Sequence, residues 1–411
     1  VKLGLPQVKA VRCTNKPNPN NNTKAPSPAL TAPALWFGPV QNGKVQMYSA
    51  SVSTYPGSSS SRIFLQELKT QTDPARPGRH SLAALDTQNI KSREPNFNSR
   101  QTVIRLPGGV YKINPGKNGG RVAGINGNDG KNDTFGIFKD RYVTPETDEW
   151  SEVLLPWTAR YYGNDDIFKT FNQPNNKKQS DKKQYSQKYR IRTKEDDNDK
   201  PRDLGDIVNS PIVAVDGYLA TSANDGMVHI FKKNGGSDER SYNLKLSYIP
   251  GTMERKDIEG NDSDLAKELR TFAEKGYVGD RYGVDGGFVL RRITDDQDKQ
   301  KHFFMFGAMG LGGRGAYALD LSKIDSSNLT GVSMFDVQND KNNNKNDNNR
   351  VKLGYTVGTP QIGKTQNGKY AAFLASGYAA KDINSNDNKT ALYVYDLENG
   401  SGSLIKKIEA P

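Results

Sequence analysis

The segment Phe306–Lys323, FGAMGLGGRGAYALDLSK, carries glycines at the spacing Gly310-x-Gly312-x-x-Gly315, the bare form of a dinucleotide-binding fingerprint. This fingerprint holds a pyrophosphate only when a strand precedes it and a helix follows, because the helix N-terminus must face the phosphates. The preceding HFFMFGAM suits a strand, but the following AYALDLSK alternates and predicts a second strand. We therefore interpret Gly310–Gly315 as a loop between adjacent antiparallel strands, in which glycine permits positive φ.

Three loops place Asp or Asn at alternate positions, as calcium-binding loops do. They begin at Asp340, Asp382 and Asn126. All three lack the bidentate Glu that position twelve requires, since that position holds Val351, Tyr393 and Ile137 respectively. We interpret them as solvated hairpin loops and assign no metal ligand.

Nucleophilic or metal-assisted catalysis finds little support. The histidines His80, His229 and His302 are dispersed, and the last two fall in predicted strands. No G-x-S-x-G, H-E-x-x-H or paired zinc spacing occurs. Cys13 is the only cysteine, which rules out an intrachain disulfide and a cysteine-based metal site. We assign no catalytic and no cofactor-binding residue.

The elements around the glycine motif belong to a repeat that begins near Leu204. Each unit has a strand, a glycine-rich or polar turn, further strands and a closing apolar run. The units lie near Ile207–Gly251, Val284–Val337 and Leu353–Pro411. Phe231, Leu319 and Tyr395 occupy matching places, at separations of 88 and 76 residues. Four-stranded repeats with glycine-rich turns predict β-propeller blades, and three blades are too few to close a ring.

Insertions explain the long spacing between units. Arg255–Gly276 predicts an inserted helix, with an N-cap region at Asp262–Asp264 and a stop at Gly276. A polar loop, DKNNNKNDNNR, follows the second unit.

Residues 1–200 predict an irregular β-rich region, in which KVQMYSASVS, RIFLQEL, QTVIRL, GVYKI and FGIFKD are strand-like. Glu149–Gly163 predicts a short helix broken at Pro156. Phe168–Arg202 has eleven Lys/Arg against five Asp/Glu. We interpret it as a solvated basic linker, with a phosphate- or glycan-binding arm as the alternative. The domain boundary is expected near 200–203.

Composition agrees with a β-rich protein that has long connections. The 411 residues include 40 glycines and are only 34 % hydrophobic, and the net charge is +12. This charge would assist binding to nucleic acid, anionic lipid or polysaccharide without choosing among them. No apolar run of membrane-spanning length and no signal-peptide pattern is seen. The chain starts at Val1 rather than Met, so we expect a processed chain or a fragment.

Several strings in the repeat region resemble the PilC/PilY family of type IV pilus tip-associated proteins. They are DLGDIVNSPIVAVDGYLATSANDGMVHIFK, GDRYGVDGGFVLRR, GAMGLGGRGAYALDLSK, LGYTVGTPQIGK and ALYVYDLENGSG, spread in order over Asp203–Pro411. The resemblance implies a modified C-terminal β-propeller, in agreement with the repeats. It also implies a secreted bacterial protein of the outer membrane, cell surface and pilus tip.

The same resemblance implies a function and partners. The family promotes pilus biogenesis by opposing retraction, acts with pilus components such as minor pilins, and serves as an adhesin for host epithelial cells, so it is a virulence factor and not an enzyme or a nucleic-acid binder. Its calcium loop, D-x-D-x-D-G, is not found here and is expected beyond Pro411, so we expect no cofactor in this chain. The loops Arg255–Gly276 and Asp336–Arg350 are candidate adhesive contacts, whereas the adhesive surface and receptor are otherwise unknown.

Two alternatives stay open. A quinoprotein-like propeller enzyme is one, although Trp36, Trp150 and Trp157 all precede the repeats, whereas those enzymes carry tryptophans within their blades. A nucleic-acid or polyanion binder that uses the basic segment is the other.

Overall fold

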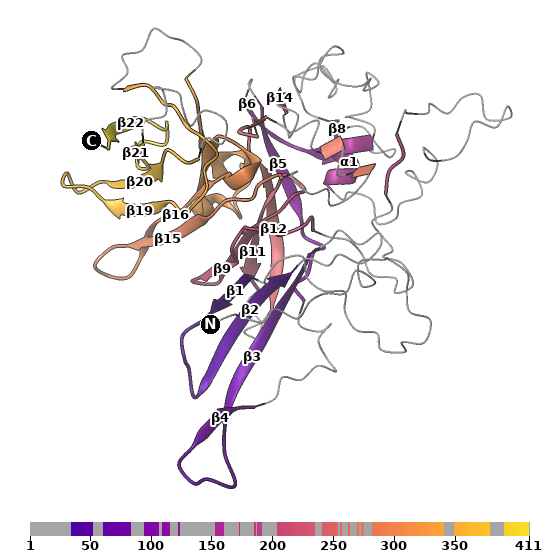
Figure 1. Cartoon of the computed structure of the whole chain (residues 1–411), viewed down its shortest axis with the longest axis vertical. Coiled ribbons are helices and arrows are strands. Elements are labelled where there is room, and N and C mark those ends of the chain that lie inside the picture. Colours follow the sequence, from indigo (N-terminus) through magenta and orange to yellow (C-terminus); the bar gives the residue numbers. More distant parts are fainter. Residues whose placement is uncertain are drawn as a thin grey trace, which may run out of the picture.

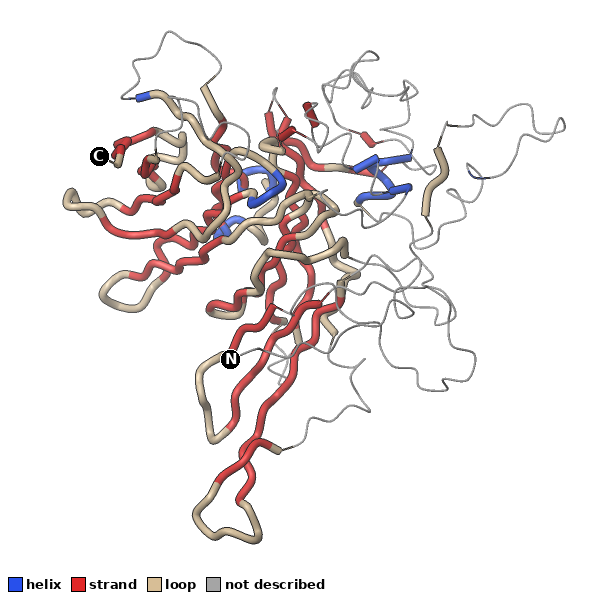
Figure 2. Tube along the Cα trace, viewed as in Figure 1, coloured by secondary structure: helices blue, strands red, loops and turns tan. Residues whose placement is uncertain are grey.

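The computed structural model consists mostly of antiparallel strands, with very little helix (Figures 1 and 2). It describes residues 34–51, 61–83, 94–106, 109–115, 122–123, 153–159, 172, 185, 187–190, 204–234, 241–253, 255–256, 262–263, 269–270, 273–274, 282–340, 349–378 and 390–410. The stretch FGIFKD and the loops that begin at Asn126 and Asp382 lie outside these ranges, as does Cys13.

The three predicted units are three four-stranded antiparallel meanders, each ordered as in the sequence. The first contains β9 (Val213–Val215), β10 (Tyr218–Ser222), β11 (Val228–Lys233) and β12 (Tyr242–Ile249). The second contains β15 (Phe288–Thr294), β16 (Gln300–Ala308), β17 (Gly315–Asp320) and β18 (Ser333–Gln338). The third contains β19 (Gln361–Lys364), β20 (Tyr370–Ala375), β21 (Ala391–Asp396) and β22 (Leu404–Glu409). They form the expected part of a β-propeller.

A β-bulge recurs at the same place in all three sheets. The register between the third and fourth strands shifts at Ile230/Phe231, at Ala318/Leu319 and at Val394/Tyr395. The second member of each pair is the residue that the sequence repeat aligned. Because a bulge increases local twist, its recurrence gives the three blades the same distortion.

Strands from the N-terminal half add to this array. A fourth antiparallel meander contains β1 (Ala34–Phe37), β2 (Lys44–Ser51), β3 (Arg62–Thr72) and β4 (His80–Leu82). Two further strands, β5 (Gln101–Leu106) and β6 (Gly109–Lys112), extend the first propeller sheet, with β5 parallel to β12. The strand-like segments described here therefore form strands as expected, and β5 covers an edge that β12 would otherwise expose.

The four meanders pack face to face in sequence order, with a hydrophobic core in each gap. Between the N-terminal sheet and the first propeller sheet, Tyr48 and Leu65 meet Leu219 and Phe231. The next core joins the first and second propeller sheets, and another joins the second and third. Strand β16 is buried on both faces, which explains its continuous apolar run HFFMFGA.

A separate core at the side of the first propeller sheet corrects one expectation. Pro156 does not break the helix but lies inside α1 (Leu155–Thr158), in a first turn where a missing N–H costs little. Trp157, at 1 % exposure, packs in this core and donates its indole N–H to the carbonyl of Arg190 at 2.8 Å.

The inserted segment 255–276 is only partly as expected. Leu269 and Ala273 lie in helical conformation and are buried in the same core. Asp262, however, is not at an N-cap, because β14 (Asp262–Ser263) pairs with β13 (Arg255–Lys256). Gly276 lies outside the described ranges. One further pair, β7 (Asn114–Pro115) with β8 (Val122–Ala123), completes the strands.

The described part of the basic segment is not a solvated linker. Tyr185 and Tyr189 are 8 % and 3 % exposed and belong to the core around Trp157. Asn172 holds Tyr189 through two hydrogen bonds to its backbone, of 2.7 and 2.8 Å. The aromatic residues of QYSQKYR therefore anchor this segment despite its lysines.

No helix among the described residues is both long enough and apolar enough to cross a bilayer.

Candidate functional site

The glycine-rich loop is a connection between strands, as its repeat context predicts. A short 3-10 helix, Gly310–Gly312, links β16 to β17, and these two strands are antiparallel neighbours. Gly310 has φ +59°, and a Cβ on Gly312 would lie 1.5 Å from the carbonyl oxygen of Gly283. The N–H of Gly310 bonds the carbonyl of Thr356 at 2.9 Å. The N–H of Gly312 likewise donates to the carbonyl of Met309, so the donors of Gly310 and Gly312 are not available to a phosphate.

Among the histidines, the structure places His229 in a buried polar relay that sequence analysis did not find. Its Nε2 lies 2.9 Å from Asp225 Oδ2, and its Nδ1 lies 2.8 Å from Ser247 Oγ. All three side chains are 0 % exposed. No substrate can reach them, and the ring nitrogens are used in the opposite order to a hydrolase triad. The available signal was one polar residue inside each of the apolar runs VHIF and LSYI.

Asp225 ties this relay to the backbone. It accepts hydrogen bonds from the N–H of Gly205 at 3.0 Å and of Met227 at 3.2 Å. The relay therefore connects the segment that precedes the first propeller sheet to strands β11 and β12 of that sheet, and its role is structural. His302 lies in β16, as expected, and its ring stacks on Phe304 at 4.9 Å between centroids.

A second polar cluster joins the first and second propeller sheets at Asp336. Its carboxylate accepts hydrogen bonds from the N–H of Gly251 at 2.8 Å and the hydroxyl of Tyr248 at 3.1 Å. Arg105 Nε lies 3.7 Å from Oδ1, and the Asp336 side chain is 5 % exposed. Burial raises the pKa of Asp336 from 3.8 to about 6, although Arg105 and the two hydrogen bonds act in the other direction.

The position of Asp336 corrects the expected start of one candidate adhesive loop. Asp336 was expected to begin an exposed loop that runs to Arg350, but it lies in β18 and faces the joint between sheets. Residues 341–348 of that loop lie outside the described ranges. In the other candidate loop, Leu269 and Ala273 are buried, so these two residues offer no contact surface.

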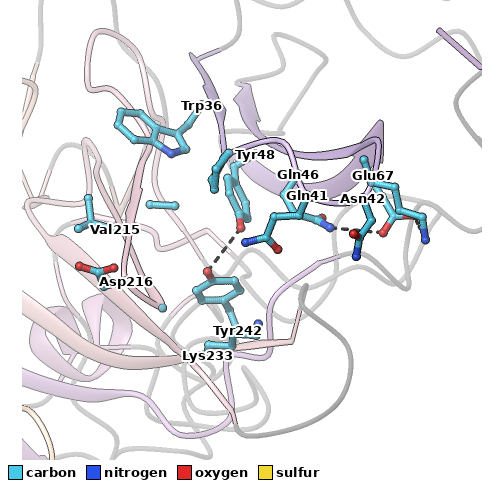
Figure 3. Close-up of a pocket in the computed structure, with 15 residues that line it drawn as sticks. Trp36, Gln41, Asn42, Gln46, Tyr48, Glu67, Val215, Asp216, Lys233 and Tyr242 are labelled. Carbon is cyan, nitrogen blue, oxygen red and sulfur yellow. Dashed lines mark hydrogen bonds and ion pairs between the residues drawn. The ribbon is translucent and has the colours of Figure 1, made fainter. Parts of the chain in front are cut away.

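The described residues do contain one open polar cleft, between the N-terminal sheet and the first propeller sheet (Figure 3). Its volume is about 580 Å³. One wall consists of β1, β2 and β3 with the turn after β1, and the other consists of the β9–β10 hairpin with Lys233 and Tyr242. The lining residues are Trp36, Gly38, Pro39, Gln41, Asn42, Lys44, Gln46, Tyr48, Glu67, Ala214, Val215, Asp216, Gly217, Lys233 and Tyr242.

Aromatic side chains fix the interior of the cleft. Tyr48 and Tyr242, one from each wall, pack edge to face with centroids 5.9 Å apart and hydroxyls 3.5 Å apart (Figure 3). Trp36 is half-buried and packs against the cores on both sides of the first propeller sheet. The aromatic residues are therefore held by the sheets and not by mobile loops.

Two tight hairpin turns bound the cleft. Asn42 and Gly43 have φ of +52° and +69°, and Asp216 and Gly217 have φ of +47° and +81°. Two successive positive φ values characterise the type I′ turn, whose twist matches that of the flanking strands. The Asn-Gly and Asp-Gly pairs thus give both turns a fixed shape.

The charges in the cleft are balanced, with Lys44 and Lys233 against Glu67 and Asp216. Glu67 accepts a hydrogen bond from Gln46 at 3.4 Å and lies 3.7 Å from Lys44. Burial acts to raise the pKa of Glu67, but its hydrogen bond with Lys69 and the charges of both lysines lower it overall. The carboxylate is consequently ionised at neutral pH.

Sequence analysis did not identify this cleft, because its residues come from segments about 170 positions apart in the chain. Within the described ranges, no three His, Cys, Asp or Glu side chains gather closely enough to hold a metal ion. The expectation that this chain holds no cofactor, with the family calcium loop beyond Pro411, stays a prediction.

Comparison with known proteins gives one family match, over residues 204–411, to the family described as the PilY1 beta-propeller domain. A type IV pilus biogenesis factor PilY1 homolog from Xylella fastidiosa is 29 % identical over 193 residues, which cover 47 % of this chain and 10 % of that protein. The type IV pilus biogenesis factor PilY1 from Pseudomonas aeruginosa strain UCBPP-PA14 is 29 % identical over 221 residues, which cover 50 % of this chain and 17 % of that protein.

Among solved structures, the crystal structure of the Pseudomonas aeruginosa PilY1 C-terminal domain matches with a TM-score of 0.29 and 22 % identity, over 47 % of this chain and 30 % of that chain. The matched region thus spans only 10 % to 17 % of the curated relatives described above.

Proposed function

Because the chain belongs to the PilY1 β-propeller domain family, we propose that it acts as a type IV pilus-associated adhesin and assembly factor. In this role it promotes pilus biogenesis by opposing retraction, and it attaches the bacterium to host cells. The observation that carries the proposal is the family match over 204–411, whose range begins just before the first propeller sheet.

The names of the relatives support the pilus part of the proposal, since both are described as type IV pilus biogenesis factors. The same names describe no enzyme, which disfavours the quinoprotein alternative. Described aromatic residues of the basic segment are buried in a core, which disfavours its use as an open polyanion-binding arm. A domain boundary near 203 is part of the proposal.

The proposed partners are pilus components, such as minor pilins or the pilus tip, and a receptor on host epithelial cells. The proposed location is the outer membrane, cell surface and pilus tip, reached by secretion. A stack of rigid sheets suits this role, because a stable scaffold can present contact surfaces at its edges and turns.

Gene deletion in the bacterium that carries this protein tests the proposal. Surface pili are counted by electron microscopy and adherence to epithelial cells is measured, in the deletion strain and in a second strain that also lacks the retraction motor. We expect few pili and weak adherence after the single deletion. The double deletion should restore pili but not adherence.

Normal pilus numbers in the single-deletion strain would refute the assembly role. Restored adherence in the double-deletion strain would refute the adhesin role, because pili alone would then account for attachment. Complementation with the complete gene is the control for both measurements.

A further inference from the structure

The cleft between the N-terminal sheet and the first propeller sheet combines an aromatic surface with closely spaced polar groups. Trp36, Ala214 and Val215 supply its apolar lining, and the amides of Gln41 and Asn42 stand at its rim. Figure 3 shows Trp36 and Tyr48 on one side of the cleft and Val215 and Asp216 on the other. A volume of about 580 Å³ lies in the usual range of small-molecule sites.

This combination suits a ligand with one apolar face and an edge rich in hydroxyls. A pyranose ring offers C–H groups on its face, which pack on an aromatic ring, and hydroxyls around its edge. Amide side chains both donate and accept hydrogen bonds, so the exposed Gln41 and Asn42 can each serve either end of a hydroxyl. Asp216 adds an acceptor in the facing turn, where a charge-assisted hydrogen bond would be strong.

The charge balance of the cleft selects against polyanions. The whole chain carries +12, so an anionic ligand would be drawn to its surface generally. Among the lining residues, however, Glu67 and Asp216 offset Lys44 and Lys233, while Lys69, which does not line the cleft, lies 3.2 Å from Glu67. A sulfated or phosphorylated ligand would have to approach the Asp216 carboxylate in the facing turn, which costs affinity and favours neutral ligands.

The cleft is also preorganised. The turns Asn42–Gly43 and Asp216–Gly217 are fixed by their positive φ values, and the pair Gln41 and Lys44 is closed by backbone hydrogen bonds of 2.8 and 2.9 Å. Tyr48 and Tyr242 hold the two sheets together at the interior of the cleft. A ligand therefore orders little of the protein when it binds, which favours affinity for small polar molecules.

We propose that this cleft is a binding site for a short neutral oligosaccharide, with Trp36 as the stacking surface and Asp216 and the rim amides as hydrogen-bonding groups. The inference rests on the proposed adhesin function and names the chemistry of its receptor contact. It places that contact outside the loops singled out from the sequence.

The test is binding of the purified full chain to an immobilised panel of neutral, sialylated and sulfated oligosaccharides, followed by fluorescence titration of the best binder. We expect binding to one or more neutral glycans, and a change in tryptophan emission that Trp36→Phe reduces. Trp36→Ala should weaken binding by about tenfold or more.

Phe37→Ala is the matched control. Phe37 is the next residue on β1, points to the opposite face and is 54 % exposed, so its loss should change affinity by less than about twofold. Asp216→Asn covers the case in which Trp36→Ala disturbs folding. Asn readily adopts positive φ, so the turn persists while the carboxylate is lost. We expect about fivefold weaker binding.

Absence of binding to every neutral glycan would overturn the inference, as would binding that Trp36→Ala and Asp216→Asn both leave unchanged. Binding only to sulfated or sialylated glycans, lost at high salt, would also overturn it and indicate a general electrostatic attraction. These outcomes are separate from the pilus counts in the deletion strains, which test assembly without reference to the cleft.

Discussion

Replacement of Asp336 by Asn should change the dependence of stability on pH by about 2 kcal/mol between pH 4.5 and pH 7.5. Burial raises the pKa of this carboxyl from 3.8 to about 6 in the folded protein. A raised folded-state pKa means that the folded protein binds the proton more tightly than the unfolded chain. The carboxyl therefore favours folding most below pH 3.8, and this contribution is lost as pH rises through about 6.

The magnitude follows from the size of the shift. A difference of about two pKa units between folded and unfolded states corresponds to about 3 kcal/mol over the whole range. Between pH 4.5 and pH 7.5 the share of Asp336 is about 2 kcal/mol, because its unfolded form is already partly ionised at pH 4.5. The Asn side chain keeps a hydrogen-bond acceptor for the N–H of Gly251 but does not titrate.

Urea unfolding of the native protein and the Asp336→Asn variant, at pH 4.5 and at pH 7.5, measures this effect. The difference in unfolding free energy between the two pH values should change by about 2 kcal/mol on substitution. Asp296→Asn, which removes an exposed carboxylate in the β15–β16 turn, is the control and should leave the difference unchanged. If the unfolding free energy depends on pH equally in the native protein and in Asp336→Asn, the raised pKa of the Asp336 carboxyl is refuted.

Two other substitutions test the packing of the propeller sheets. Gly312→Ala should destabilise the protein by more than about 3 kcal/mol in urea unfolding, because its Cβ would lie 1.5 Å from the carbonyl oxygen of Gly283. Gly331→Ala is the control: its Cβ would meet nothing closer than 3.4 Å, so its free energy of unfolding should change by less than about 1 kcal/mol. Similar losses of stability in the two variants would contradict the close approach of Gly312 to Gly283. Asp225→Ala should cost about 3 kcal/mol or more, since it removes the partner of His229 Nε2 and the acceptor of two buried backbone N–H groups. A change below about 0.5 kcal/mol in thermal unfolding would show that the relay is not structural.

The repeat in the sequence was enough to predict the three propeller sheets and the nature of the glycine-rich loop. Local patterns carry this information, because alternation, tight turns and strand length act over a few residues. The residues that the repeat aligns, Phe231, Leu319 and Tyr395, lie in the structure at the recurrent bulge, which the sequence did not predict. The Asn42–Gly43 and Asp216–Gly217 pairs are turn signals of the same local kind.

Expectations failed where burial depended on distant segments. Lysines around Tyr185 and Tyr189 suggested solvent, yet both rings fill a core built from α1 and the helical residues near Ala273. Asp336 was assigned to a loop because a polar stretch follows it, but Arg105, which is 231 positions away in sequence, meets it at the joint between sheets. In both cases the contacting residues are distant in sequence, so the residues adjacent along the chain could not predict the contact.

The sequence by itself determined the class of the fold, the three repeated sheets and the family, since each depends on local periodicity or on strings of residues in order. Only the tertiary structure decided which sheet faces which, and therefore the buried relay at His229, the joint at Asp336 and the cleft at Trp36. The physical reason is that a stack of sheets gains its stability from apolar faces that meet across long stretches of chain, and the polar groups at the edges of those faces acquire their partners from the same stacking.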